Sequence, residues 1–198
     1  YGAVENAATV QEVSAALPEL KVVSMLNGKY IILGAEFSPV VNPHAYGNAW
    51  FISSAVPAGS PDEEIGLLAS TDIRNTAVIG KDFQWALDAV GRLASGSETD
   101  RIDASEQETA ADTAGHAGAT QEDYIKLSSY APNEMHYDFK TTADRAVIFS
   151  EVYYPDGWKA WIEPAGSNGE VKNGKYQPGA KAIPVELCRA DWILRGAV

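Results

Sequence analysis

Aromatic and charged side chains gather in the segment Phe149–Glu163, where they could stack on a sugar ring and orient its hydroxyl groups. Exposed aromatic rings offer flat apolar area, and a neighbouring acid or amine can fix hydroxyl direction. Because side chains alternate along a strand, Trp158 and Trp161 are expected on opposite sides of it. One tryptophan then belongs to the core, and the other is exposed or covered by the rest of the chain. The candidate ligand-binding residues are Tyr153, Tyr154, Trp158, Trp161, Glu151 and Lys159.

Carboxylates in the same segment suggest a second chemistry, glycoside hydrolysis, which needs two acids facing one sugar. Asp156 lies in a Pro-Asp-Gly turn and Glu163 ends a strand, so ordinary structural roles explain both. Glu151 lies inside an apolar strand, where an unpaired carboxylate would be costly. We therefore expect Glu151 to form an ion pair with Arg189 or Arg195. Ligand contact is the second interpretation and catalysis the third.

Other patterns that carry chemistry are missing from the sequence. His44, His116 and His136 are far apart, and no Cys/His cluster has metal-ligand spacing. No nucleophile elbow, P-loop or dinucleotide fingerprint occurs. We therefore expect no catalytic residue, no metal and no cofactor. Cys188 lies among apolar residues and is expected to be a small buried hydrophobe, which leaves the redox compartment undecided.

Composition narrows the classes of partner. The 198 residues carry a formal net charge of −12, which disfavours nucleic acid and anionic lipid headgroups, since both attract clusters of Lys and Arg. Hydrophobic residues make up 45%, enough for one domain or two small ones to form a core without disulfides. No apolar run approaches the ~18–20 residues of a membrane span. The segment 192–198 still has the pattern of a strand, so we expect the chain to be a piece of a longer protein.

The elements that must position these side chains begin with a mixed helix-and-strand part over residues 1–95. Thr9 and Glu12 fit a capping box, and Ser60 precedes a proline and acids as a helix start does. Asn27 and Gly28 form a helix stop. The expected helices are Thr9 to Pro18, Pro18–Leu26, Ser60 to Ser70 and one after Asp82; the expected strands are Lys29–Leu33, Trp50–Ile52 and Thr76–Ile79.

Residues 96–123 differ in character from the rest. They hold eight acidic residues against Arg101 and contribute −7 of the net charge, with little apolar surface to offset the entropy of ordering. We expect a solvated acidic insert or linker, with at most a weak helix near Ser105–Asp112. A calcium loop is the sharper alternative, but the regular Asp-x-Asp-x-Asp-Gly spacing is missing.

Residues 124–198 have the strand-and-turn periodicity of a β-sandwich or curled sheet. Pro155–Gly157 is expected to close a β-hairpin within Phe149–Glu163, and Pro164–Pro184 to be a long loop. The expected strands are Tyr124–Tyr130, Met135–Thr141, Arg145–Tyr154, Gly157–Glu163 and Val185–Val198. The predicted fold class is therefore α+β, with a small mixed α/β N-terminal part packed on a C-terminal antiparallel β-sandwich.

Five segments, spread over nearly the whole chain, carry a resemblance to a known family. They are Met25–Ile32, Asn42–Phe51, Tyr130–Asn133, Phe149–Ile162 and Arg189–Arg195. Together they resemble the C-terminal extracytoplasmic region of the YfhO-like bacterial integral membrane proteins, which are polytopic and related to membrane glycosyltransferases of the GT-C type. The string Phe-Ser-Glu-x-Tyr-Tyr-Pro-x-Gly-Trp-Lys-Ala is the most specific. The chain departs from the family in its Pro164–Pro184 segment, which replaces an Asp-Gly-Lys turn, and in its long acidic segment.

The resemblance implies a non-catalytic extracytoplasmic domain that braces a membrane part or orients a glycan or lipid-linked acceptor. None of the five segments is a catalytic motif, so chemistry would belong to the membrane-embedded part. The implied partners are the remainder of the same polypeptide and a cell-envelope glycan or lipid-linked sugar. The implied location is periplasmic or at the cell surface, anchored by membrane spans outside this segment. The alternatives are an independent carbohydrate-binding module and, third, a glycoside hydrolase.

Overall fold

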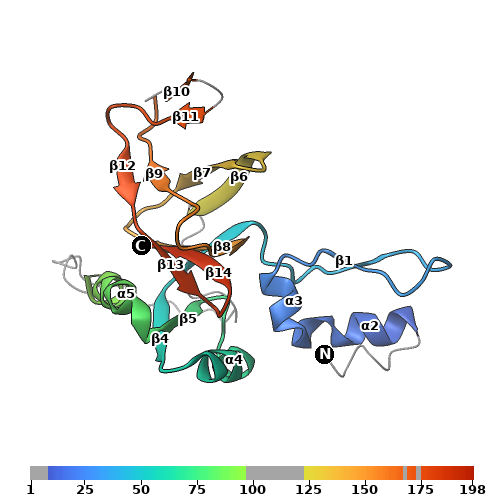
Figure 1. Ribbon diagram of the computed structural model, residues 1–198. Coiled ribbons are helices and arrows are strands. Elements are labelled where there is room, and N and C mark those ends of the chain that lie inside the picture. The colour runs from blue at the N-terminus through green and yellow to red at the C-terminus, as the bar shows by residue number, and fades with distance from the viewer. Residues whose placement is uncertain (1–8, 97–122, 167–168, 173–174) are drawn as a thin grey trace, which may run out of the picture.

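The computed structural model describes residues 9–96, 123–166, 169–172 and 175–198. Its content of about 25% helix and 37% strand confirms the predicted α+β class. Figure 1 shows a central sheet from which two other parts extend in different directions. One is the N-terminal part, in blue, and the other consists of strands within residues 124–140 and 160–185, in yellow and orange.

Six strands form the central sheet, in the order β3-β8-β14-β13-β5-β4. Their bounds are β3 Ala49–Ile52, β4 Ser54–Ala58, β5 Thr76–Gly80, β8 Ala146–Val152, β13 Leu187–Ala190 and β14 Leu194–Ala197. The neighbours β4 and β5 are parallel, and the other neighbouring pairs of this sheet are antiparallel. The sheet thus takes three strands from the first half of the chain and three from the second.

Two helices complete the core on this sheet. Helix α4 (Pro61–Ser70) connects β4 to β5, and α5 (Gln84–Gly96) follows the short helix η2 (Lys81–Phe83). Both pack against β4 and β5. The Ser60 side chain accepts the Glu63 N–H at 3.2 Å, as its sequence context predicted. The core around them includes Leu68, Ile73, Val78, Ile79, Ala86, Val90, Ile148 and Leu194.

The N-terminal part has a small core of its own. Its elements are α2 (Val10–Ala16), η1 (Leu17–Glu19), α3 (Lys21–Met25), β1 (Tyr30–Ile31) and β2 (Val40–Val41). The capping box is confirmed, since Thr9 Oγ1 accepts the Glu12 N–H and the Glu12 carboxylate accepts the Thr9 N–H. The predicted stop is confirmed by Asn27, whose φ of 57° is left-handed. The buried hydrophobic cluster of this part consists of Val13, Leu17, Leu20 and Val40.

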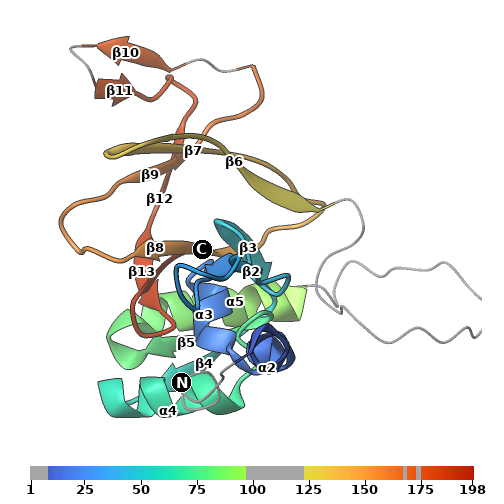
Figure 2. The same cartoon turned by 90° about the vertical axis from the view of Figure 1, so that its right-hand side faces the viewer.

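The remaining strands lie beyond β8, as Figure 2 shows with β6 and β7 above β8 and with β10 and β11 farther out. They form three two-stranded antiparallel pairs. The pairs are β6 (Tyr124–Ala131) with β7 (Glu134–Lys140), β9 (Ala160–Ile162) with β12 (Ile183–Val185), and β10 (Glu170–Lys172) with β11 (Lys175–Gln177).

The hairpin predicted within Phe149–Glu163 is not formed, although the turn at Pro155–Gly157 is present and the segment contains no helix. Strand β8 lies inside the central sheet, where β3 and β14 occupy both of its edges. It therefore has no edge left for β9, which pairs with β12 instead. The prediction that Pro164–Pro184 is only a loop is also wrong, because it contains β10, β11 and the start of β12.

The turn of the β13–β14 hairpin is hydrogen-bonded to β5. Asp191 and Trp192 adopt left-handed backbone angles, with φ of 49° and 69°. The Asp191 N–H donates to the Val78 carbonyl at 2.7 Å, and the Val78 N–H donates to Asp191 Oδ1 at 2.8 Å. Cys188 on β13 is buried as predicted, and burial raises the pKa of its thiol to about 12.

The acidic insert expected over 96–123, its weak helix and His116 fall almost entirely on residues outside the described ranges. Among the helices of the described ranges, none has the length and apolar character that a membrane span requires.

Candidate ligand-binding site

A surface hollow of about 480 Å³ brings together most of the predicted binding residues. We call it the aromatic hollow. Tyr153, Tyr154, Trp158, Lys159 and Trp161 line it, as do side chains from two other parts of the chain. Its further lining residues are Phe83, Trp85, Pro155, Ala160, Pro184, Val185, Glu186 and Leu187. The site is thus assembled where the start of α5, the segment after β8 and strand β12 meet.

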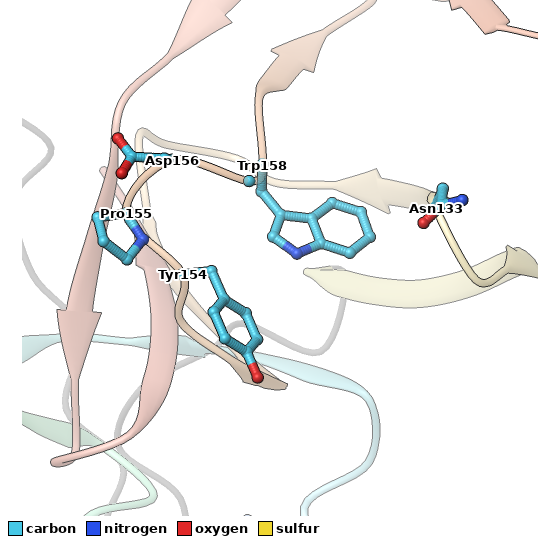
Figure 3. A pocket seen from close by; sticks show the side chains of 6 residues that line it. Asn133, Tyr154, Pro155, Asp156 and Trp158 are labelled. Atoms are coloured by element: carbon cyan, nitrogen blue, oxygen red, sulfur yellow. The ribbon is translucent and has the colours of Figure 1, made fainter.

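A second hollow of about 490 Å³ adjoins the first. We call it the polar hollow; it is lined by Asn133, Tyr154, Pro155, Asp156, Gly157 and Trp158. Figure 3 shows the Trp158 indole between Tyr154 and Asn133, which lies at the turn between β6 and β7. Tyr154, Pro155 and Trp158 line both hollows, which therefore share one wall.

Neither candidate tryptophan belongs to the core, contrary to the expectation that one of them would, and both line the aromatic hollow. Trp158 precedes strand β9, so strand alternation does not set its direction. Trp161 is 40% exposed, whereas Trp158 is half-buried. Tyr154 is 61% exposed, and Tyr153 is half-buried with its ring edge-to-face against Phe83 at 5.5 Å between centroids. The hollows therefore combine fixed aromatic walls with outward-facing aromatic rims.

Arg195 holds Trp158 in place. Its Cζ lies 4.3 Å from the centroid of the Trp158 ring, a cation–π contact. Arg195 is only 6% exposed, and its Nη2 donates to the Val152 carbonyl at 3.2 Å. Burial lowers the pKa of Arg195, and the nearby Glu151 charge opposes that effect. A buried guanidinium thus covers one face of the indole and fixes its orientation.

Glu151 does not form the ion pair that its sequence context predicted. Its side chain is half-buried, and within the described ranges it has no ion pair or hydrogen bond. The Glu151 charge acts on Arg195, but the Arg195 guanidinium stacks on Trp158 instead of pairing with Glu151. Arg189 pairs with Glu64 instead, with 3.0 Å between Nη2 and Oε1. Glu151 lines neither hollow, so its part in a site would be indirect, through Arg195.

The three acids considered for hydrolysis are not gathered around one hollow. Asp156 lines the polar hollow, whereas Glu163 accepts hydrogen bonds from the Tyr176 hydroxyl and, at 2.7 Å, from the Gly179 N–H. These bonds lower the pKa of Glu163, as expected for a carboxylate with a structural role. Glu186, which the sequence analysis missed, lines the aromatic hollow.

The residues missed from sequence come from distant segments. Phe83 and Trp85 belong to the helical region after β5, Asn133 to the β6–β7 turn and Glu186 to the junction of β12 and β13. Phe83 lies in the helical region expected after Asp82, and no local signal linked it to Trp158. Within the described part of the chain, no group of three or more His, Cys, Asp or Glu side chains could hold a metal ion.

A buried ionic cluster lies outside both hollows. Glu64 is fully buried and accepts a hydrogen bond from the partly exposed Arg189 guanidinium. Asp191 is also fully buried, and its Oδ1 accepts the Val78 N–H. Burial raises the pKa of Asp191 to about 7; the Val78 bond opposes this and the Glu64 charge adds to it. Burial also raises the pKa of Glu64, against the effect of Arg189. This cluster joins α4, β5 and the β13–β14 hairpin.

Comparisons of the chain with protein-family models, with curated proteins and with solved structures found no match.

Proposed function

We propose that this chain is a non-catalytic glycan-binding domain. The observation that carries the proposal is the aromatic hollow, in which six aromatic side chains from two separate segments line one surface depression beside Lys159 and Glu186. Aromatic faces supply apolar stacking area for sugar rings, and a few charged groups can fix hydroxyl orientation. The aromatic residues are Phe83, Trp85, Tyr153, Tyr154, Trp158 and Trp161.

Charge favours a neutral glycan as the ligand. The chain carries −12, and Asp156 and Glu186 line the two hollows against the single cation Lys159. An anionic polysaccharide would meet a repulsive field, whereas a neutral sugar would lose nothing to it. Hydrolysis has less support, because Glu151, Asp156 and Glu163 are distributed over different surroundings.

The setting of the domain is part of the proposal. The resemblance of the chain to the YfhO-like family supports an extracytoplasmic region of a polytopic glycosyltransferase-like protein, in which the domain would orient a glycan or lipid-linked acceptor for the membrane part. Recovery of the full-length protein with the membrane fraction, with this region accessible to protease from outside the cell, is the expected outcome. Recovery as a soluble cytoplasmic protein would contradict this setting without bearing on glycan binding itself.

A bracing role is the second candidate, and one observation favours it. Tyr30 and Ile32 on or beside β1 and Val41 on β2 are 66%, 72% and 61% exposed. Tyr30 pairs with Val41 in register, so their side chains form an apolar patch on one face of the β1–β2 pair, and Ile32 directly follows β1. Such a patch is typical of a contact surface.

Titration distinguishes the two candidates. Neutral and anionic cell-envelope glycans are added while tryptophan fluorescence and NMR shifts are followed. Trp161→Ala is expected to weaken binding at least tenfold, whereas Tyr30→Ala, which removes an exposed aromatic ring outside both hollows, leaves it unchanged. Absence of binding at millimolar glycan, or unchanged binding by folded Trp161→Ala, would leave bracing as the better function.

A further inference from the structure

We infer that the ligand is a linear, uncharged oligosaccharide that crosses Trp158 and occupies both hollows, so that the two hollows are adjacent subsites of one site. The inference rests on the proposed glycan binding and specifies its substrate class. It begins from the shared wall, since Tyr154, Pro155 and Trp158 line both hollows.

The size of the hollows supports two subsites rather than one. Their volumes are about 490 and 480 Å³, and small-molecule sites generally measure roughly 300–1,000 Å³. Each hollow is therefore large enough to be a site in its own right. Because they meet at the Trp158 wall, a chain of linked units can fill one and continue into the other.

The two hollows differ in chemistry in the way that successive subsites would. The aromatic hollow presents Trp161, Trp85 and Phe83, which favour stacking. The polar hollow adds Asn133, whose amide both donates and accepts, and Asp156, whose carboxylate accepts from hydroxyls. We assign the aromatic hollow to the main binding contact and the polar hollow to the recognition of the next unit.

Trp158 is suited to be the junction because it cannot swing freely. Arg195 covers one of its faces and is itself anchored to the Val152 carbonyl. A ring that is already immobilised loses little entropy when a ligand binds. Arg195 is thus a positioning residue for the junction, although it lines neither hollow.

The test is the dependence of affinity on chain length. The probes are N-acetylglucosamine oligomers of one to six units and uncharged glucose oligomers of the same lengths. In the series that binds, affinity is expected to rise at least tenfold from one unit to four and then to level off. A combined Asn133→Ala and Asp156→Asn variant is expected to lose this gain while keeping the affinity for one unit. Both positions are exposed, so the variant is expected to fold, and its melting temperature checks this.

The matched control is Asp138→Asn, which removes an exposed acid of β7 outside both hollows and is expected to change nothing. Equal affinity for one and four units would overturn the two subsites and leave the proposed glycan binding intact. A length dependence that survives the Asn133 and Asp156 changes would overturn the assignment of the polar hollow. If no oligomer of either series binds, the proposed function fails and the subsites fail with it.

Discussion

Asp191 shows how a single residue can join a turn to a sheet at an electrostatic cost. Its Oδ1 replaces a strand carbonyl as the acceptor for the Val78 N–H, while its own N–H donates to Val78. Its Oδ2 is buried with no hydrogen-bond partner in the described part of the chain. A carboxylate in this position lacks both solvent and a full set of donors, so the protonated form is favoured.

The pH dependence of stability follows from that carboxyl. Its pKa rises from 3.8 to about 7 on folding, so between these values the folded protein binds the proton that the unfolded chain has released. Stability therefore falls as pH rises from about 4 to 7, by an amount on the order of 4 kcal/mol. Asp191→Asn keeps the acceptor for Val78 and removes the titration. Urea unfolding of both proteins across this range should show the wild type losing stability relative to the variant. Parallel pH profiles would contradict the assignment.

Arg189 and Glu151 provide a contrast between a buried pair and a half-buried acid. Arg189→Ala leaves the fully buried Glu64 without its cation. Breaking a fully buried pair costs about 3–5 kcal/mol, which is an upper bound here because Arg189 is partly exposed. The loss should be smaller at pH 5 than at pH 8, because the pKa of Glu64, already raised, rises further and the carboxyl takes up a proton. Thermal unfolding at the two pH values measures this.

Glu151→Ala is the matched comparison and is expected to change stability by no more than about 1 kcal/mol, since within the described residues the Glu151 side chain has charge interactions with Arg195 and Tyr137 but no ion pair or hydrogen bond. A loss as large as that of Arg189→Ala would mean that Glu151 has a direct partner. That outcome would restore the ion pair that the sequence predicted.

At the scale of elements, the β13–β14 hairpin depends on the absence of a side chain at Gly196. A Cβ there would lie 2.9 Å from Cys188 Sγ and 3.3 Å from Ile148 Cδ1. Gly196→Ala is therefore expected to destabilise the protein by about 1–3 kcal/mol through overpacking. Cys188→Ala removes the closest atom, so the double variant should lose less stability than the two single changes together. Denaturant unfolding of the four proteins tests this; strictly additive losses would show that Cys188 is not the obstacle.

The elements that the sequence predicted well are those with local signals. Thr9 and Ser60 cap helices through bonds to residues three positions ahead, and such spacing is visible in a sequence. Strand partners are not local. Strand β9 pairs with β12, whose Ile183 and Pro184 lie some twenty residues further on, because the edges of β8 are already occupied. Alternation reveals that a strand exists, but not which strand it pairs with.

The residues of the candidate site show the same difference between local and non-local signals. Tyr153, Trp158 and Trp161 belong to one short segment, so composition alone singled them out. Phe83 and Asn133 reach the same hollows from segments on either side of residues 97–122. Their contribution depends on the tertiary arrangement, which no local pattern encodes.

At the scale of the whole molecule, the two halves of the chain share one sheet. Strand β8 lies between β3 of the first half and β14 of the second, and β13 lies between β14 and β5. Cross-half hydrogen bonds extend beyond the sheet, since the Ser150 hydroxyl contacts the Met25 and Gly47 carbonyls at 2.8 and 2.7 Å. The buried ionic cluster likewise joins Glu64 to Arg189. We therefore expect the core to form only when both halves are present.

Fragments test this directly. Residues 124–198 alone would keep β8, β14 and β13 but expose the edges that β3 and β5 cover, together with the buried faces of Ile148 and Leu194. We expect that fragment, and residues 1–96 alone, to show no cooperative unfolding transition in urea by circular dichroism. Mixed in equal amounts, the two are expected to regain one transition, because every cross-half contact can form again. A cooperative transition of 124–198 by itself would show an independently folding C-terminal domain, as the sequence-based division at 124 predicts.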